Sequence, residues 1–253
     1  QKSIGFFRMS TEFAVEWVPL IHNEMMNHEL TVTKTKYETH DVFSTYFPKS
    51  FDYKPGQYLM LELDVEDPEG NTRPLSIASS PTEDFILIST KIRDTPFKQK
   101  LVTLKEGDKV KAMGPMGVFT LKEDAKEIIF LGGGIGITPF RDMIKYACDK
   151  KLPIKMTLLY SNKTTADICY KDEWPLFEEQ NPNLKVVNTI TDDATDWNGR
   201  TGRINESMIK EFSSENTLFY ICGPPGMVAG LFELLKSMYI PLSNVKIEKF
   251  AGY

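Results

Sequence analysis

The sequence predicts a two-part protein, with an all-β half followed by an α/β half that contains a parallel sheet. Residues 29–121 hold short runs of alternating apolar and polar residues between turn-forming residues, which is typical of antiparallel strands. After residue 123, strand-like runs alternate with helical patterns, which indicates a parallel sheet. The 253 residues are enough for two domains of this kind.

The strands expected in the first half are rich in β-branched and aromatic residues. In chain order they read LTVTKTKY, QYLMLEL, FILISTKI and KVKAMG. Turn-forming residues separate them, at Pro55-Gly56, in DPEGN (residues 67–71) and at Glu106-Gly107-Asp108. Strands at this spacing predict an antiparallel barrel or sandwich over residues 29–122.

The second half begins with EIIFLGGG, a buried strand that runs into a glycine turn. Further strands read IKMTLLYS, LKVVNTIT and TLFYICG. Apolar residues at helical spacing mark two amphipathic helices: Phe140, Met143, Ile144 and Ala147 in one, and Met227, Leu231, Leu234, Leu235 and Met238 in the other. We therefore expect an α/β domain over residues 123–253.

Composition and charge exclude several classes of protein. With 41% apolar and 26% charged residues the chain is typical of a globular protein, and a net charge of −5 argues against nucleic-acid binding. Cys148, Cys169 and Cys222 have no CxxC spacing, which excludes a cysteine-held metal and indicates a reducing, cytoplasmic location. No apolar run approaches the roughly 18–20 residues needed to cross a bilayer.

The N-terminal segment, residues 1–28, has no assigned role. It is interpreted as a docking segment, a tail or part of an upstream domain, and the sequence does not choose among these. His22, His28 and His40 lack the spacing of metal ligands, and no metal is expected.

The segment FLGGGIGITPF lies where a strand passes into a helix, which is the context of a phosphate-binding turn. Gly133, Gly134 and Gly136 would let the backbone approach a pyrophosphate. Thr138 is expected to be the N-cap and Pro139 the first helical residue. The usual dinucleotide fingerprint has a third glycine where Pro139 stands, and no acid ends the following strand. Alone, the turn fits a nucleotide site and a tight strand–helix joint equally well.

Four motifs occur in order along both halves: RPLSIASSP (residues 73–81), MGPMGVF (113–119), GGGIGITP (132–139) and YICGPPGM (220–227). Together they resemble the ferredoxin–NADP reductase family of flavoenzymes, over roughly residues 29 to 253. The resemblance implies a Greek-key flavin-binding barrel followed by a pyridine-nucleotide domain. It also implies transfer of a hydride from nicotinamide to flavin.

The resemblance places Arg73, Pro74, Leu75 and Ser76 at the family's Arg-x-Tyr-Ser motif. There the arginine pairs with a flavin phosphate, and the serine lies near flavin N5, which receives the hydride. Leu75 departs from the tyrosine of the family. Further flavin contacts are expected at Gly114, Gly117, Phe119 and Tyr253, where Tyr253, or Phe250 in its place, would stack on the flavin ring.

Thr-Pro-Phe followed by a basic residue occurs twice, as DTPFK (residues 94–98) and ITPFR (residues 137–141). Thr95 as N-cap and Pro96 at the first position would begin the helix PFKQKLVTL, with free N–H groups facing the flavin pyrophosphate. The second copy would do the same for the nicotinamide nucleotide. Lys98 either adds charge there or is solvated. FAD is expected, with FMN as the alternative because the plant-type glycine-x-x-serine is absent.

The resemblance places Cys222 beside the nicotinamide C4, so that Cys222 and Ser76 are the expected catalytic residues. Gly223, Pro224 and Met227 would line the same pocket. The competing interpretation of Cys222 is a small apolar residue at a strand end.

The choice between NADH and NADPH depends on two residues that follow a strand, Thr191 and Asp192. Family members that use NADPH commonly place Ser-Arg there. A carboxylate accepts hydrogen bonds from a 2′-hydroxyl and repels a 2′-phosphate, so NADH is preferred.

These observations predict an NADH-dependent flavoprotein reductase that passes electrons from bound FAD to a one-electron acceptor, such as a ferredoxin, an iron–sulfur protein or a cytochrome. One alternative is an electron-transfer subunit of a larger redox complex, with residues 1–28 as its docking arm. Another is a non-catalytic redox sensor that binds flavin or nucleotide. The acceptor, the direction of electron flow and the oligomeric state stay open.

Overall fold

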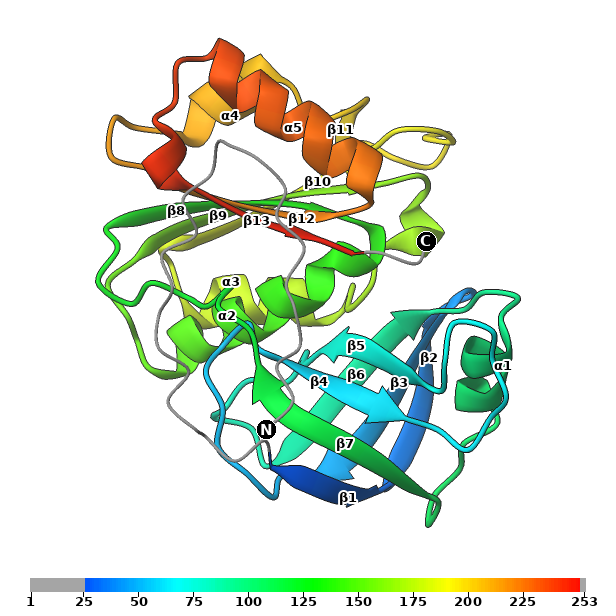
Figure 1. The fold of residues 1–253 in the computed structure, drawn as a ribbon. Helices are drawn as coiled ribbons and strands as arrows, with labels where there is room; N and C mark the ends of the chain where they lie inside the picture. The colour runs from blue at the N-terminus through cyan, green and yellow to red at the C-terminus, as the bar shows by residue number, and fades with distance from the viewer. Residues whose placement is uncertain (1–25, 251–253) are drawn as a thin grey trace, which may run out of the picture.

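The computed structural model describes residues 26–250, and it contains an antiparallel part followed by a parallel α/β part (Figure 1). The predicted fold class is confirmed. β1 begins at Asn27, inside the segment 1–28 that was expected to precede the barrel. Residues 1–25 lie outside the described residues, as does Tyr253.

Two antiparallel sheets make up the first part. One has the order β1-β7-β4-β5 and the other the order β2-β3-β6. Their strands are β1 (Asn27–Thr31), β2 (Lys34–Thr39), β3 (Val42–Pro48), β4 (Tyr58–Glu62), β5 (Thr72–Ser76), β6 (Phe85–Lys91) and β7 (Lys109–Met116). Alternate residues of β4, Leu59 and Leu61, point into the core between the sheets. Helix α1 (Pro96–Val102) closes this core with the fully buried Phe97.

The second part is a six-stranded parallel sheet of order β11-β10-β9-β8-β12-β13. Its strands are β8 (Glu127–Gly133), β9 (Lys155–Asn162), β10 (Leu184–Ile190), β11 (Arg200–Thr201), β12 (Leu218–Gly223) and β13 (Val245–Lys249). Every residue of β8 is buried, as expected for a central strand covered on both faces.

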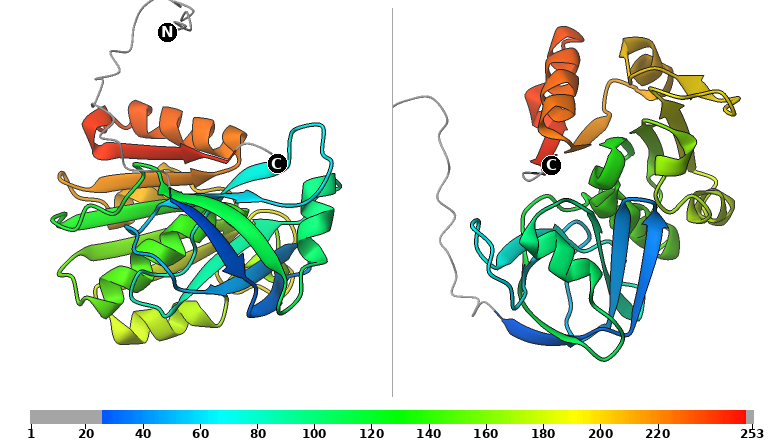
Figure 2. Two further views of the ribbon diagram at one scale, coloured as in Figure 1. Left: turned by 60° about the horizontal axis from the view of Figure 1, so that its bottom comes forward. Right: turned by 90° about the vertical axis from the view of Figure 1, so that its right-hand side faces the viewer.

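α-Helices cover both faces of this sheet (Figures 1 and 2). α2 (Thr138–Asp149) and α3 (Glu173–Gln180) pack on the face that contains Phe130, while α4 (Glu206–Phe212) and α5 (Pro225–Ser237) pack on the face that contains Leu131. Single-turn 3-10 helices are η1 (Gly134–Ile137), η2 (Thr165–Asp167) and η3 (Leu242–Asn244). Within residues 26–250, every helix is too short or too polar to span a bilayer.

Two neighbouring residues of α2 join the parallel part to the antiparallel part. Arg141 is 4% exposed, donates to the carbonyl of Ala78 at 2.8 Å and forms ion pairs with Glu83 at 2.9 Å and Glu173 at 2.6 Å. The fully buried Asp142 accepts a hydrogen bond from the backbone N–H of Gly56 at 2.6 Å. Burial raises the pKa of Asp142 well above its usual range. The first turns of α2 are therefore anchored to the antiparallel part.

Candidate functional site

A cavity of about 280 Å³ lies between the antiparallel sheets and the parallel sheet. Its walls come from β4, β5, β6 and α1 on one side, and from η1, the start of α2 and the end of β13 on the other. The lining residues are Tyr58, Pro74, Leu75, Ser76, Ser89, Thr90, Lys91, Lys98, Ile135, Thr138, Glu248, Lys249 and Phe250. Both parts of the chain are needed to build it.

The cavity brings together residues that the sequence assigned to two different ligands. Pro74, Leu75 and Ser76 of the predicted flavin motif face Thr138 of the predicted nucleotide turn across it. Phe250, the aromatic alternative to Tyr253, also lines it, and its backbone N–H donates to the carbonyl of Gly223 at 3.3 Å.

Glu248 is a lining residue that the sequence patterns did not indicate. It lies on β13 directly beside Cys222 of β12, and its Oε2 is buried without a hydrogen-bond partner among residues 26–250. Burial raises the pKa of Glu248 to about 7. The available signal was a single acid within the terminal strand-like run of the chain, whose packing next to the predicted Cys222 is a tertiary contact.

Lys98 also lines the cavity. It is half-buried rather than solvated, and its ammonium donates to Thr90 Oγ1. Burial, together with the nearby positive charges of Arg73 and Arg93, lowers the pKa of Lys98 to about 8. The cavity therefore contains a cation and an acid that are both shifted toward their neutral forms.

Arg73 is absent from the cavity lining and has partners within its own turn. Its guanidinium lies 2.9 Å from Asp67 Oδ1 and 3.3 Å from Glu69 Oε2, and it donates to the carbonyl of Gly70 at 2.6 Å. It also lies over the ring of Phe97, 5.1 Å from the ring centroid. The charge expected to meet a flavin phosphate is thus neutralised by two carboxylates of the chain.

The start of α1 has the conformation that its sequence predicts. Its backbone N–H groups, however, are not all free to bind a ligand. Thr95 is the N-cap, its Oγ1 accepts from the backbone N–H of Lys98 at 3.3 Å, and Pro96 is the first helical residue. The backbone N–H of Phe97, however, donates to Asp67 Oδ2 at 2.9 Å. The same carboxylate therefore binds Arg73 and one of the N–H groups that were expected to face an anion.

The prediction that Thr138 is the N-cap of the helix after the glycine turn is wrong, because Thr138 is the first residue of that helix. Gly134 has a φ of +52°, so the chain turns directly into η1, and Thr138 is already helical with φ −57° and ψ −51°. Its hydroxyl donates to the carbonyl of Ile135 at 3.1 Å instead of accepting an N–H. Pro139 follows within the first turn of α2.

The glycine turn and the loop after β12 are in direct contact. A Cβ on Gly136 would lie 2.5 Å from the carbonyl oxygen of Cys222 and the Cα of Gly223, and one on Gly133 would lie 2.3 Å from the sulfur of Met227. A side chain at position 136 would collide with backbone atoms, whereas one at position 133 would have to displace the flexible end of Met227. The structure thus brings these predicted nucleotide residues together, with Pro224 as the N-cap of α5.

Cys222 lies beneath this contact and is fully buried. Burial, followed by the charge of neighbouring Glu248, raises the pKa of its thiol well above the ordinary value. The thiol is absent from the cavity lining. These surroundings fit the apolar interpretation of Cys222, and its place beside the nicotinamide stays a prediction.

Thr191 and Asp192 follow β10, at the edge of the parallel sheet where β8 and β12 also end. Neither residue lines the cavity. The backbone N–H of Thr191 donates to the carbonyl of Asn162 at 2.9 Å, and the N–H of Asp192 to the carbonyl of Lys163 at 3.0 Å. The side chain of Asp192 is exposed.

The remaining predicted flavin contacts lie beside the cavity and not in its lining. Gly114 and Gly117 both have positive φ, and a Cβ on Gly117 would lie 3.0 Å from the ring of Tyr58, which does line it. Phe119 is buried and packs on the rings of Phe140 and Tyr220. Gly114 and Gly117 therefore pack against Tyr58 of the cavity wall.

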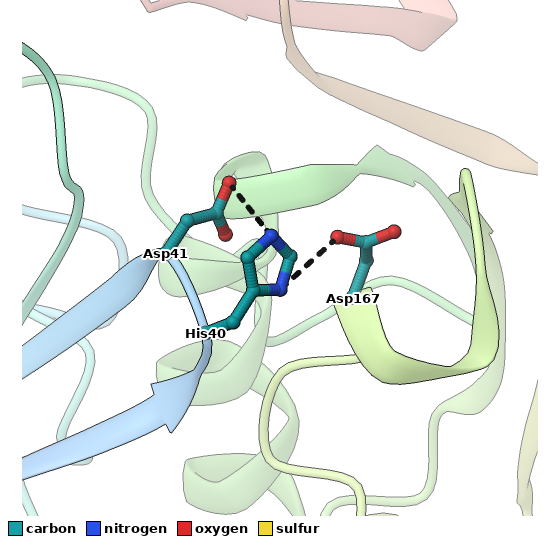
Figure 3. Close-up of side chains that lie close together, drawn as sticks. All are labelled: His40, Asp41 and Asp167. Carbon is teal, nitrogen blue, oxygen red and sulfur yellow. Dashed lines mark ion pairs between the residues drawn. The ribbon is translucent and has the colours of Figure 1, made fainter.

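His40 lies between two carboxylates at a contact between β2–β3 and η2 (Figure 3). Its ring nitrogens lie 3.8 Å from Asp41 and 3.9 Å from Asp167, so three groups that can bind a metal come together. Both carboxylates already have partners in the chain: Lys91 lies 2.6 Å from Asp41, and Thr164 donates to Asp167 at 2.8 Å. We interpret the group as a polar contact between the two parts of the molecule.

Part of the chain matches a known protein family, and nearly all of it is similar to known oxidoreductases. The family model described as an oxidoreductase NAD-binding domain matches residues 130–232. One subunit of the Na(+)-translocating NADH-quinone reductase of Pseudoalteromonas atlantica is 26% identical over 256 residues, which cover 94% of this chain and 62% of that protein. The equivalent subunit of Haemophilus influenzae (strain PittEE) is 30% identical over 203 residues, 71% of this chain and 48% of that protein. The chain thus spans about half to three-fifths of these relatives.

Solved structures share the complete fold. The Amycolatopsis cytochrome P450 reductase GcoB superposes with a TM-score of 0.78 at 22% identity, covering 89% of this chain and 71% of that one. A ferredoxin NADP+ reductase from Neisseria gonorrhoeae, with bound FAD and NADP, gives a TM-score of 0.76 at 20% identity, covering 88% and 98% of the two chains.

Proposed function

This chain belongs to the ferredoxin–NADP reductase-like family, and from that premise we propose that it is an NADH-dependent flavoprotein reductase. Its cofactor is FAD, with FMN as the alternative, and its electrons go to a one-electron acceptor. The observation that carries this proposal is the cavity in which Ser76 of the antiparallel part faces Thr138 and Glu248 of the parallel part.

The residues present fit a flavin that meets a nicotinamide. Tyr58, Leu75 and Phe250 supply apolar walls, while the buried, unpartnered Oε2 of Glu248 needs a hydrogen-bonding group from a ligand. Gly133 and Gly136 let the glycine turn pack closely against Met227 and the loop after β12, so that the predicted nucleotide residues lie together. Bound flavin would supply the hydride acceptor and the ability to release electrons singly.

The chain's own residues orient the reactants and exclude water. Ser76 is 7% exposed and lies in the cavity wall, where its hydroxyl can donate to a ring nitrogen. Glu248, with its pKa near 7, can hold or release a proton at Oε2 at neutral pH. Cys222 supports Glu248 from the adjacent strand and stays a neutral thiol.

The preference for NADH is assigned to Asp192, whose exposed carboxylate follows β10 beside Thr191. It can accept from a ribose 2′-hydroxyl and would repel a 2′-phosphate. The curated relatives are named NADH-quinone reductase subunits, which supports the same preference.

The acceptor is a ferredoxin, an iron–sulfur protein or a cytochrome. The solved relatives include a cytochrome P450 reductase and a ferredoxin reductase, which supports acceptors of this class. The names of the curated relatives also favour a second candidate, in which the chain is the electron-entry subunit of a larger redox complex.

The proposal is tested by an anaerobic titration of the FAD-loaded protein with NADH and, separately, with NADPH, while the flavin absorbance is followed. Bleaching at a lower concentration of NADH is the expected result. Asp192→Ser should reduce the difference between the concentrations of NADH and NADPH that bleach the flavin. Asp193→Ser, the same change at the next residue, should leave this difference unchanged. A protein that takes up neither FAD nor FMN would refute the proposed function, and faster bleaching by NADPH would refute the preference alone.

Addition of ferricyanide or cytochrome c to the reduced protein separates the two candidate functions. An independent reductase should turn over with NADH and such an acceptor. A subunit that works only within a complex should be reduced once and then stop.

A further inference from the structure

We propose that Lys98, and not Arg73, is the cation that holds the phosphate-bearing part of the flavin; this inference rests on the proposed function. It replaces the role that the family motif gives to Arg73. Three observations carry it: the partners of Arg73, the position of Lys98 in the cavity, and the partners of the other lysines around it.

Arg73 has its charge already compensated in this arrangement. Its guanidinium forms ion pairs with Asp67 and Glu69 and donates to a carbonyl of the same turn. The carboxylate of Asp67 is 2% exposed, and it also accepts the backbone N–H of Phe97. To bind a phosphate with the same N–H groups, Arg73 would have to give up these ion pairs and hydrogen bonds.

Lys98 is in the opposite situation. It lines the cavity, is half-buried and donates to the neutral hydroxyl of Thr90, and no carboxylate within residues 26–250 pairs with it. A buried ammonium without an anion is unfavourable, and a ligand phosphate would satisfy it. The lowered pKa of Lys98 has the same cause.

The two other lysines of the lining do not compete for this role. Lys91 is paired with Asp41 at 2.6 Å. Lys249 is exposed at the end of β13, where water already solvates its charge. Lys98 is therefore the cavity lysine that combines partial burial with the lack of a carboxylate partner in the described chain.

The test compares flavins with and without phosphate. Flavin-free protein is titrated with FAD, FMN and riboflavin, and the dissociation constants are measured by quenching of flavin fluorescence. Lys98→Met should weaken FAD and FMN about 10- to 100-fold, the range expected for a lost hydrogen bond to a charged group, and change riboflavin less than about threefold. Lys98→Arg should restore most of the loss.

Two variants act as controls for the charge change. Lys100→Met removes an exposed lysine from the same helix and should leave all three constants unchanged. Arg73→Gln should affect FAD and FMN no more than riboflavin, because its role is to hold the turn through Asp67. Circular dichroism tests whether each variant is folded. If Lys98→Met does not fold, Lys98→Arg and Arg73→Gln are compared instead.

Each contrary outcome has a definite meaning. A selective loss of FAD and FMN in Arg73→Gln but not in Lys98→Met would overturn the inference, and so would an equal loss of riboflavin in Lys98→Met. If the wild-type protein binds no flavin at all, the proposed function fails and this inference fails with it. If the wild type and Lys98→Met bind flavin with the same affinity, only this inference fails.

Discussion

Lys98 and Arg141 end the same tetrapeptide pattern, Thr-Pro-Phe followed by a basic residue, and they have opposite roles in the structure. In both copies the phenylalanine, Phe97 or Phe140, is fully buried. Arg141 then enters a network with two carboxylates and a carbonyl, while Lys98 enters a cavity with a hydroxyl as its neighbour. The shared pattern therefore fixes an apolar anchor and leaves the role of the cation to its surroundings.

The two cations differ in their partners: within residues 26–250, Arg141 pairs with carboxylates and Lys98 does not. Burial alone would lower the pKa of Arg141, but the hydrogen bond and charge of Glu83 and the charge of Glu173 raise it. For Lys98, burial and the neighbouring arginines all lower the pKa, to about 8. Paired buried charges hold elements together, whereas groups moved toward neutrality are typical of functional sites.

The largest expected effect is on stability when the paired cation is removed. Arg141→Met should lower the free energy of unfolding by about 3–5 kcal/mol, because Glu83 and Glu173 would keep their charges without a partner. Urea unfolding followed by circular dichroism measures this. Lys98→Met, the matched change in the other copy, should cost less than about 1 kcal/mol, as it leaves no buried carboxylate behind. An equal decrease in the free energy of unfolding in the two variants would contradict the different roles given to Arg141 and Lys98.

An effect of intermediate size is expected at Glu248, whose Oε2 is buried without a hydrogen-bond partner among residues 26–250. Its pKa is raised from the ordinary 4.5 to about 7, so its contribution to stability is fully present below pH 4.5 and is lost as the pH rises through about 7. Glu248→Gln removes this dependence, and the variant should gain about 3 kcal/mol relative to the wild type between pH 4.5 and pH 8.

The measurement for Glu248 is urea unfolding of both proteins at several pH values across this range. Glu215→Gln, at an exposed loop position, serves as the control and should run parallel to the wild type. A constant difference between Glu248→Gln and the wild type would show that the carboxyl group ionises normally in the folded protein.

The smallest effect concerns the two threonines of the repeated pattern. Thr95→Val should cost about 1 kcal/mol because it removes the N-cap acceptor of α1. Thr138→Val should change stability by less than about 0.5 kcal/mol, since the carbonyl of Ile135 still accepts from the backbone N–H of Thr138 and the apolar side chain suits a buried position. Thermal unfolding compares them, and a larger loss in Thr138→Val would contradict the assignment of the caps.

Local patterns predicted much of this molecule correctly. The change from alternating to helical spacing located the two parts, and Thr95 was recognised as a cap because an N-cap depends on residues only three positions apart. The same rule was wrong for Thr138, because the positive φ of Gly134 starts a helical turn four residues earlier. The rule identifies a residue suited to capping but not where the backbone first becomes helical.

Contacts between distant segments could not be predicted from local patterns. DPEGN indicated a turn, and nothing in it showed that Asp67 would reach both Arg73 and the start of α1. The sequence around Glu248 does not distinguish it from other polar residues. Its place in the cavity depends on the pairing of β13 with β12. The neutralised arginine and the unpartnered acid are both consequences of tertiary packing. The residue-by-residue assignments to cofactors stay predictions for the experiments above.

The position of β13 also has a consequence for the order of events during synthesis. One wall of the cavity is made by β5, β6 and α1, and another by Glu248 and Phe250 at the end of the final described strand. Domains generally fold as units while the chain emerges from the ribosome. The antiparallel part can therefore fold early, but a cofactor that needs both walls can be enclosed only after nearly all of the described chain has been made.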